Sequence, residues 1–484
     1  MKPLLLAVIS LSCLVFPFAV AGAEPVSLAV DTRHAAQEIL GFGASGAWWA
    51  QEVGGWPEAE RKALVRLLYD KTTGIGLDIY RYNIGADTLG DKTIKVWQRR
   101  AESLLNTKTG RFDWSRDANA RRILHDAVEA GAGQVILFAN SAPVSMTVNG
   151  RGYCDKQPSK ENKKSNLEPA RYRDFAAYLG EITEHFVRVE KVPVVALSPV
   201  NEPGWPWDTS KQEGCYYSPG QVVGVLKAVG AELARRKLPV PMEAPEDAAW
   251  GASLKYIKEI NRDPVLRAAI KDFCTHSYVE NEDWGSTPAQ KKKVRDWLDK
   301  NRPDARLHMS EWCELKDGLG ADMDGALMMV KIMMQDLTIG GASTWQWWLG
   351  ATYKKYRDGL IYYDSKTRKI TLTKRYWAMG QFSRNLVKGS VMLGMKSSDA
   401  QAPALAARRP DGSVAVICAN LSGEDKTMDV RFPKNEKWEA RSRSITDDKN
   451  DNTVSSGGDD GGVGSSVSNA LPGHSVVTVI FRKK

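Results

Sequence analysis

The chain has 484 residues, enough to bury one barrel-sized domain together with a smaller one. Its net charge of +9 and its pI near 9.0 permit nucleic acid, an anionic surface or an acidic polysaccharide as a partner. The lysines lie in short groups between acidic residues and no nucleic-acid-binding module is visible, so we interpret the excess charge as a solvated basic surface.

Residues 1–23 have the layout of a secretory signal. Lys2 precedes an apolar stretch that ends at Val20, and small residues follow it. We therefore expect a secreted protein, extracellular or periplasmic, and no other apolar run is long enough to span a bilayer. The alternative is a lipoprotein anchored through Cys13, but the residues before this cysteine fit such a signal poorly.

From residue 39 to residue 348, short apolar runs alternate with longer amphipathic segments. Pro219 and Pro288 mark first helical turns, with Ser218 and Thr287 as their caps. Eight such strand–helix units predict an α/β protein built on a closed (β/α)8 TIM barrel. The predicted strands are residues 39–45, 76–84, 134–140, 194–201, 240–244, 273–278, 306–311 and 343–348.

The pattern changes after the predicted barrel, residues 39–380. Residues 381–484 contain short alternating strands separated by turn residues, which is typical of an antiparallel β-sandwich. Residues 24–38 contain a further strand before the barrel.

The tetrapeptide Val200-Asn201-Glu202-Pro203 ends the fourth predicted strand, and Glu311 ends the seventh. In a parallel barrel the catalytic groups gather at these carboxyl ends. One carboxyl group there can protonate a glycosidic oxygen while the other attacks the anomeric carbon, with the two groups roughly 5 to 5.5 Å apart in a retaining enzyme. A lone glutamate at a strand end is usually a salt-bridge partner, but two at matching ends favour catalysis.

Polar neighbours support the same chemistry. Asn201 can hold a sugar hydroxyl beside the acid, and Asn140 ends the third strand. Arg81 and Tyr278 could hydrogen-bond Glu311 and keep it ionised, although each has a structural alternative as a rim ion pair or rim hydrogen bond. His276 either contacts the substrate site or is a satisfied interior group.

Tryptophans cluster at or just beyond the strand ends, where flat indoles can bind sugar faces. Because strand residues alternate, Trp345 and Trp347 point one way and Trp348 the other. We predict that Trp345 and Trp347 bind substrate, together with Trp49 and Trp205.

Five cysteines remain once Cys13 leaves with the signal, so the cysteines cannot all be paired within one chain. Cys154 and Cys215 lie in loops at one rim of the predicted barrel, which makes them the preferred disulfide pair; the alternative is two small buried thiols. The absence of a Cys-x-x-Cys motif or a histidine cluster argues against a zinc site.

Together these motifs resemble glycoside hydrolase family 30, within the clan of retaining (β/α)8 glycosidases. The resemblance implies Glu202 as acid/base, Glu311 as nucleophile, no cofactor, and a β-sandwich built from both chain ends, residues 24–38 and 381–484. The motifs that carry it are Gly41 to Ser45 with Trp48-Trp49, Arg81 to Gly85, Ser198 to Pro203, and Ser310-Glu311-Trp312.

Within the family, the chain is most similar to endo-β-1,6-galactanases, in its Trp48-Trp49 pair and its Gln212-Glu213-Gly214 insertion. It departs from them at Val144-Ser145, where larger aromatic residues are expected. Endo-xylanases, β-1,6-glucanases and exo-β-glycosidases of the family therefore stay open. Two other classes are a carbohydrate-binding protein on a glycosidase scaffold and a basic adhesion protein, whose binding would collapse with salt.

Overall fold

The computed structural model describes residues 25–456 and 463–484. The predicted signal peptide, residues 1–23, and Cys13 within it lie outside this range. Within the described residues, no helix combines the length and the apolar character needed to cross a membrane.

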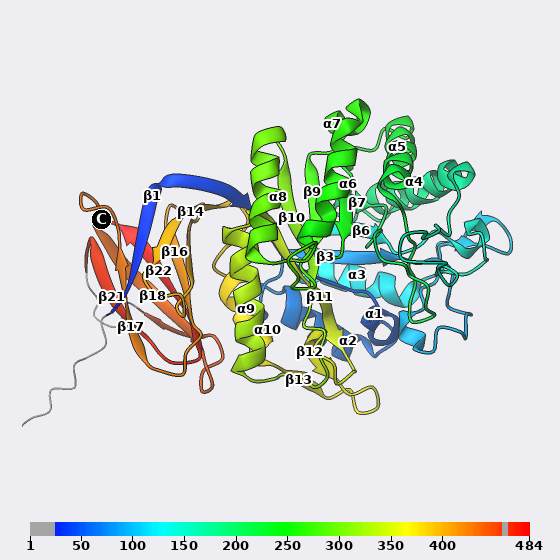
Figure 1. Cartoon of the computed structure of the whole chain (residues 1–484). Coiled ribbons are helices and arrows are strands. Elements are labelled where there is room, and N and C mark those ends of the chain that lie inside the picture. Colours follow the sequence, from blue (N-terminus) through cyan, green and yellow to red (C-terminus); the bar gives the residue numbers. More distant parts are fainter. Residues whose placement is uncertain (1–24, 457–462) are drawn as a thin grey trace, which may run out of the picture.

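Eight parallel strands within the described residues form a closed barrel in which neighbours in space are neighbours in sequence (Figure 1). A parallel bridge between Leu197 and Met242 joins the first and last strands of the hydrogen-bonded path and closes the ring. The barrel strands are β2 (Gly41–Ser45), β3 (Ile79–Ile84), β6 (Gln134–Ala139), β7 (Val194–Ser198), β8 (Glu243–Asp247), β9 (Asp272–His276), β10 (Arg306–Trp312) and β11 (Ala342–Thr352).

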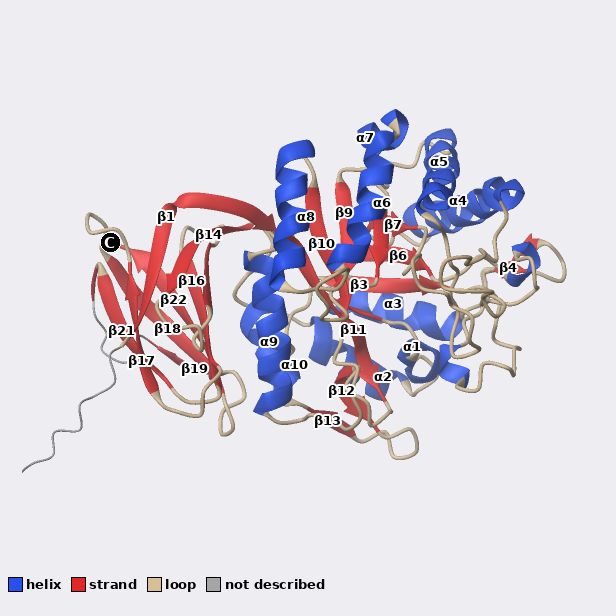
Figure 2. Ribbon diagram, viewed as in Figure 1, coloured by secondary structure: helices blue, strands red, loops and turns tan. Residues whose placement is uncertain are grey.

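Helices surround the barrel, as Figure 2 shows by colour. Ser218 begins α5 with a reciprocal capping box and Thr287 caps α8, which confirms both predicted helix starts. The helices are α1 (Trp49–Val53), α2 (Glu58–Tyr69), α3 (Ala118–Ala130), α4 (Tyr172–Arg188), α5 (Pro219–Arg235), α6 (Trp250–Arg262), α7 (Pro264–Ala269), α8 (Pro288–Asn301), α9 (Met323–Thr338) and α10 (Lys374–Ser383).

The second domain is a mostly antiparallel β-sandwich with an apolar core of its own. The first strand of the chain belongs to it, since β1 pairs with β14 in antiparallel and with β17 in parallel orientation. Its strands are β1 (Val26–Ile39), β14 (Ser390–Ser397), β15 (Ala404–Arg408), β16 (Val414–Asn420), β17 (Lys426–Arg431), β18 (Trp438–Thr446), β19 (Thr453–Ser456), β20 (Val463–Gly464), β21 (Ser466–Leu471) and β22 (Ser475–Lys483).

The barrel and the sandwich meet along α9 and α10 (Figure 1). Gln381, buried on α10, donates to Thr446 at 3.0 Å and accepts hydrogen bonds from Ser444 and Thr478, both at 2.8 Å. A buried amide with these hydrogen-bond partners across the interface helps to fix the orientation of the sandwich relative to the barrel.

Candidate active site

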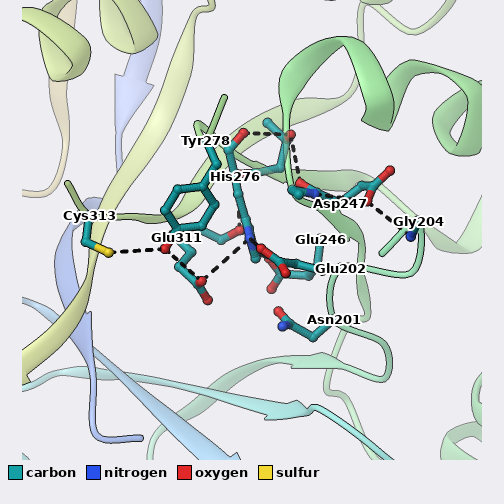
Figure 3. A network of polar contacts seen from close by, with 12 residues as sticks. Asn201, Glu202, Gly204, Glu246, Asp247, His276, Tyr278, Glu311 and Cys313 are labelled. Carbon is teal, nitrogen blue, oxygen red and sulfur yellow. Dashed lines mark hydrogen bonds and ion pairs between the residues drawn. The ribbon is translucent and has the colours of Figure 1, made fainter. Parts of the chain in front are cut away.

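The polar residues predicted for the site meet at the carboxyl ends of the barrel strands (Figure 3). Arg81 lies on β3, His276 ends β9 and Glu311 lies near the end of β10, while Asn201 and Glu202 follow β7. Tyr278 follows β9, and Asn140 follows β6. The strand-end placement inferred from the sequence therefore holds for six of these residues, whereas Arg81 lies in the middle of β3 and reaches the cluster through its long side chain.

Glu311 is held from two sides and is 5% exposed. Arg81 donates to its Oε2 atom at 2.6 Å, and the Tyr278 hydroxyl donates to its Oε1 atom at 3.0 Å. Burial raises the pKa of the Glu311 carboxyl, while the positive charges of His276 and Arg81 oppose that rise. Both predicted hydrogen bonds are confirmed, and they fix the orientation of this carboxylate.

Glu202 faces Glu311 across a short gap. A carboxylate oxygen of each, together with a ring nitrogen of His276, all lie within 4.8 Å of one another. His276 Nδ1 lies 3.1 Å from Glu202 Oε1 and 3.7 Å from Glu311 Oε1. The side chain of Glu202 is 13% exposed against 6% for Glu311, so Glu202 is the more open of the two to the barrel mouth.

A chain of side-chain amides runs from Arg81 through Asn201 and Asn140 to Asn83 on β3. Arg81 donates to Asn201 Oδ1 at 2.9 Å, Asn201 donates to Asn140 Oδ1 at 2.9 Å, and Asn140 donates to Asn83 Oδ1 at 3.0 Å. Each Nδ2 in this chain keeps a second hydrogen, so Asn201 and Asn140 can still donate to a sugar hydroxyl.

Glu246 joins the cluster, although the sequence pattern did not single it out. The fifth strand was predicted to end at residue 244, but β8 runs to Asp247 and so carries Glu246 to the barrel mouth. Glu246 is fully buried and contacts Arg81, His276 and Ser310. Three acids among the five residues of β8 were the signal that could have identified it.

The structure corrects three of the four predicted aromatic contacts. Trp345 and Trp347 are fully buried on the helix side of β11, where their indole nitrogens donate to Asp336 of α9 and to the carbonyl of Asp358. Trp49 is 1% exposed and donates to the carbonyl of Ser45. The alternation argument was sound, but the register of β11 turns the opposite face toward the barrel mouth.

Trp348 lies on the opposite face of that strand from Trp345 and Trp347. It meets Trp48 edge to face at 5.2 Å and Phe138 at 6.3 Å, and the guanidinium of Arg81 lies over the Phe138 ring. Trp205, also predicted to bind substrate, has 49% of its surface exposed to solvent. Trp205 therefore offers the exposed indole surface, while Trp48 is half-buried and Trp348 is only 6% exposed.

Cys154 and Cys215 lie together at the rim, as predicted, but they are free buried thiols without a covalent bond. Hydrogen bonding to Cys215, with burial, raises the pKa of the Cys154 thiol. Burial alone would raise the pKa of Cys215, but hydrogen bonds from Cys154, Tyr217 and Ser165 lower it to about 7. A thiolate at Cys215 beside a second thiol is the arrangement that oxidation requires.

The cluster also offers ligand atoms at metal-binding distances, from Glu202, His276 and Glu311. Burial alone would lower the pKa of His276, but the charge of Glu311 and hydrogen bonds with Glu202 and Glu246 raise it to about 10. An imidazolium has no free lone pair, so this arrangement favours proton chemistry over metal coordination.

Comparison with known proteins identifies two matched regions. The model described as O-glycosyl hydrolase family 30 matches residues 25–362, and the model of the glycosyl hydrolase family 30 beta sandwich domain matches residues 389–479. An endo-β-1,6-galactanase of Hypocrea rufa is 24% identical over 383 residues, which cover 73% of each chain.

Two solved structures share the fold. A conserved exported protein from Bacteroides fragilis superposes with a TM-score of 0.80 at 20% identity, over 94% of this chain and 100% of that one. The catalytic domain of xylanase C from Talaromyces cellulolyticus superposes with a TM-score of 0.74 at 17% identity, over the same shares of the two chains.

Proposed function

Because the chain belongs to glycoside hydrolase family 30, whose members are retaining glycosidases, we propose that Glu202 is its acid/base and Glu311 its nucleophile. The observation that carries this proposal is the pair of carboxylate oxygens within 4.8 Å. This short separation leaves no room for the water that an inverting enzyme places between its carboxyl groups, so it supports direct attack.

The reaction proceeds in two displacements. In the first, an oxygen of Glu311 attacks the anomeric carbon as the glycosidic bond breaks, and Glu202 gives its proton to the leaving oxygen. In the second, Glu202 takes a proton from water, which attacks the same carbon and releases Glu311. Arg81 and Tyr278 hold Glu311 in line for both steps.

The charges and the exposure of the cluster support this division of roles. Arg81 and His276 are cations, and Glu246 and Glu311 balance them as anions. Glu202 is the more exposed of the two facing carboxyl groups, which favours it as the group that carries the catalytic proton.

For the substrate, we propose a β-1,6-linked galactan cleaved within the chain, with export directed by residues 1–23. The similarity to the Hypocrea rufa galactanase and the two sequence features shared with such enzymes support this choice. Trp205, with 49% of its surface exposed, supplies an indole surface for a neighbouring sugar unit.

The substrate is tested by hydrolysis of β-1,6-galactan, xylan and β-1,6-glucan in parallel, followed by sizing of the products. We expect the galactan to be hydrolysed fastest and to give products of mixed length from internal cleavage. Products of single size from one chain end would replace endo with exo action, and preference for another polysaccharide would reassign the substrate.

The catalytic roles are tested with Glu202→Ala and Glu311→Ala. Both should lose hydrolysis of the galactan, and azide should restore turnover of an activated aryl glycoside, with a β-glycosyl azide from the first and an α-glycosyl azide from the second. Glu314→Ala is the matched control, because Glu314 pairs with Arg357 outside the cluster. Unchanged hydrolysis in either alanine variant of the pair would remove the assignment.

A further inference from the structure

Glu246 lies at the base of the cluster, with no exposed side-chain surface. Its Oε1 atom lies 3.2 Å from Arg81, and its Oε2 atom accepts a hydrogen bond from Ser310 and lies 3.1 Å from His276 Nε2. Burial alone would raise the pKa of Glu246, but the charge of Arg81 and the hydrogen bond with His276 hold it well below its usual range. Glu246 is therefore an ionised group under the site.

His276 connects this charge to Glu202 (Figure 3). The ring is fully buried, and its two nitrogens each face a carboxylate at 3.1 Å, Nε2 toward Glu246 and Nδ1 toward Glu202. Only an imidazolium donates from both nitrogens, so a protonated ring can donate to the ionised Glu246 and to the unprotonated oxygen of the Glu202 carboxyl. Glu246 thus stabilises the cation that directs a hydrogen bond at Glu202.

A second link joins the two residues through the backbone. The N–H of Glu202 donates to the carbonyl of Glu246 at 2.7 Å. Both residues adopt left-handed conformations, with φ of 42° at Glu202 and 57° at Glu246, which residues with a Cβ rarely adopt. Backbone strain of this kind persists only where the surroundings enforce it, and it gathers at functional sites.

We propose that Glu246 is a positioning residue for the acid/base step: through His276 and through its own carbonyl, it holds the Glu202 carboxyl in the orientation for proton transfer to the leaving oxygen. Glu246 touches neither substrate nor the reacting atoms. The proposal rests on the acid/base role of Glu202 given above.

Other charged groups surround the pair and set the background for any change of pH. Arg81 of β3, Cys274 of β9 and Glu243 of β8 face Glu246. Glu202, Glu311 and the Tyr278 ring face His276, and Asp247 acts on it from β8. Among these charged groups of the described residues, Glu246 is the one hydrogen-bonded to His276 Nε2.

The test compares two leaving groups in Glu246→Gln. A poor leaving group, such as a sugar, needs the proton from Glu202, whereas 2,4-dinitrophenolate does not. We expect kcat/KM to fall by about 100-fold or more for a galacto-oligosaccharide, and by less than about 5-fold for the dinitrophenyl glycoside, because general acid catalysis contributes about 10²–10⁴-fold. With the galacto-oligosaccharide, the alkaline limb of the pH–rate profile should also shift, because the His276 imidazolium loses its carboxylate partner Glu246.

Glu243→Gln is the matched control. Glu243 is an equally buried glutamate three residues away on the same strand, and it contacts His308 instead of His276. It should lower kcat/KM equally for the two leaving groups or not at all. Ser310→Ala removes only the hydroxyl that donates to Glu246, and it should show the same leaving-group selectivity at smaller size even where Glu246→Gln does not fold.

Equal losses for both leaving groups in Glu246→Gln and Ser310→Ala, with an unshifted pH profile, would overturn the proposal. Failure of the underlying assignment has a different signature. If Glu202→Ala hydrolyses the oligosaccharide normally, then Glu202 is not the acid/base, whatever the behaviour of the Glu246 variants.

Discussion

Arg81 and Glu311 form a fully desolvated ion pair, with a guanidinium nitrogen 2.6 Å from a carboxylate oxygen and side chains that are 1% and 6% exposed. The same guanidinium reaches Asn201 and Glu246, so one planar group orders three acceptors across the barrel mouth. A lysine ammonium cannot reproduce this fork, because its charge is compact and its donors are not coplanar.

Arg81→Lys should therefore impair catalysis more than folding. We expect kcat/KM on the natural polysaccharide to fall by about 10- to 150-fold, since a hydrogen bond to a charged group contributes about 1.5–3 kcal/mol. Steady-state kinetics with thermal unfolding in parallel measures this. Arg357→Lys, which alters the ion pair with Glu314, should keep the parent kcat/KM; equal kinetics in the two variants would contradict the role of Arg81.

Trp205 and Trp345 should separate binding from stability. Trp205→Ala removes a half-exposed ring, so we expect a higher KM for long substrates with an unchanged melting temperature. Trp345→Ala removes a fully buried ring and should lower the free energy of unfolding by about 3–5 kcal/mol. Chemical denaturation and KM measured against chain length distinguish the two, and a large KM effect confined to Trp345→Ala would reverse our assignment.

Glu213 should make stability depend on pH. Burial raises the pKa of this carboxyl to about 8, against hydrogen bonds from Thr88 and the Ala86 N–H that favour the charged form. A carboxyl group with a raised folded-state pKa stabilises the fold fully below its ordinary pKa of 4.5, and that contribution is lost as the pH rises toward 8.

Glu213→Gln keeps the shape of the side chain and removes its titration. The difference in unfolding free energy between this variant and the parent should therefore grow in favour of the variant from pH 5 to pH 8, as measured by denaturant titration. A constant difference across this range would show that the pKa of Glu213 in the folded protein is not raised above its ordinary value.

Cys154 and Cys215 should form a disulfide on oxidation, because their thiols already lie in hydrogen-bond contact and a pKa of about 7 leaves a substantial fraction of Cys215 as thiolate at neutral pH. Peptide mapping of the oxidised protein without a reductant should find the two peptides joined. The bond should stabilise the protein by about 4 kcal/mol, the value expected for a loop of this length. Cys274, buried in the barrel, serves as the control that stays free. Full alkylation of both rim cysteines after denaturation would contradict the prediction.

The sequence alone determined the barrel, the helix starts at Ser218 and Thr287, and the placement of Glu202 and Glu311 at matching strand ends. These features depend on local signals: an apolar run, a capping residue, an acid directly after a strand. A parallel barrel then brings the strand ends together, whatever the details of its packing.

Only the tertiary structure decided which face of a strand looks inward and where a strand stops. Trp345 and Trp347 alternate with Trp348, and a shift of one residue exchanges their sides, so pairing with β2 and β10 was needed to place Trp348 at the mouth. The end of β8 was misplaced by three residues, and with it Glu246. A buried charge owes its position to partners on other strands, here Arg81 and His276, and contacts so distant in sequence leave no local pattern.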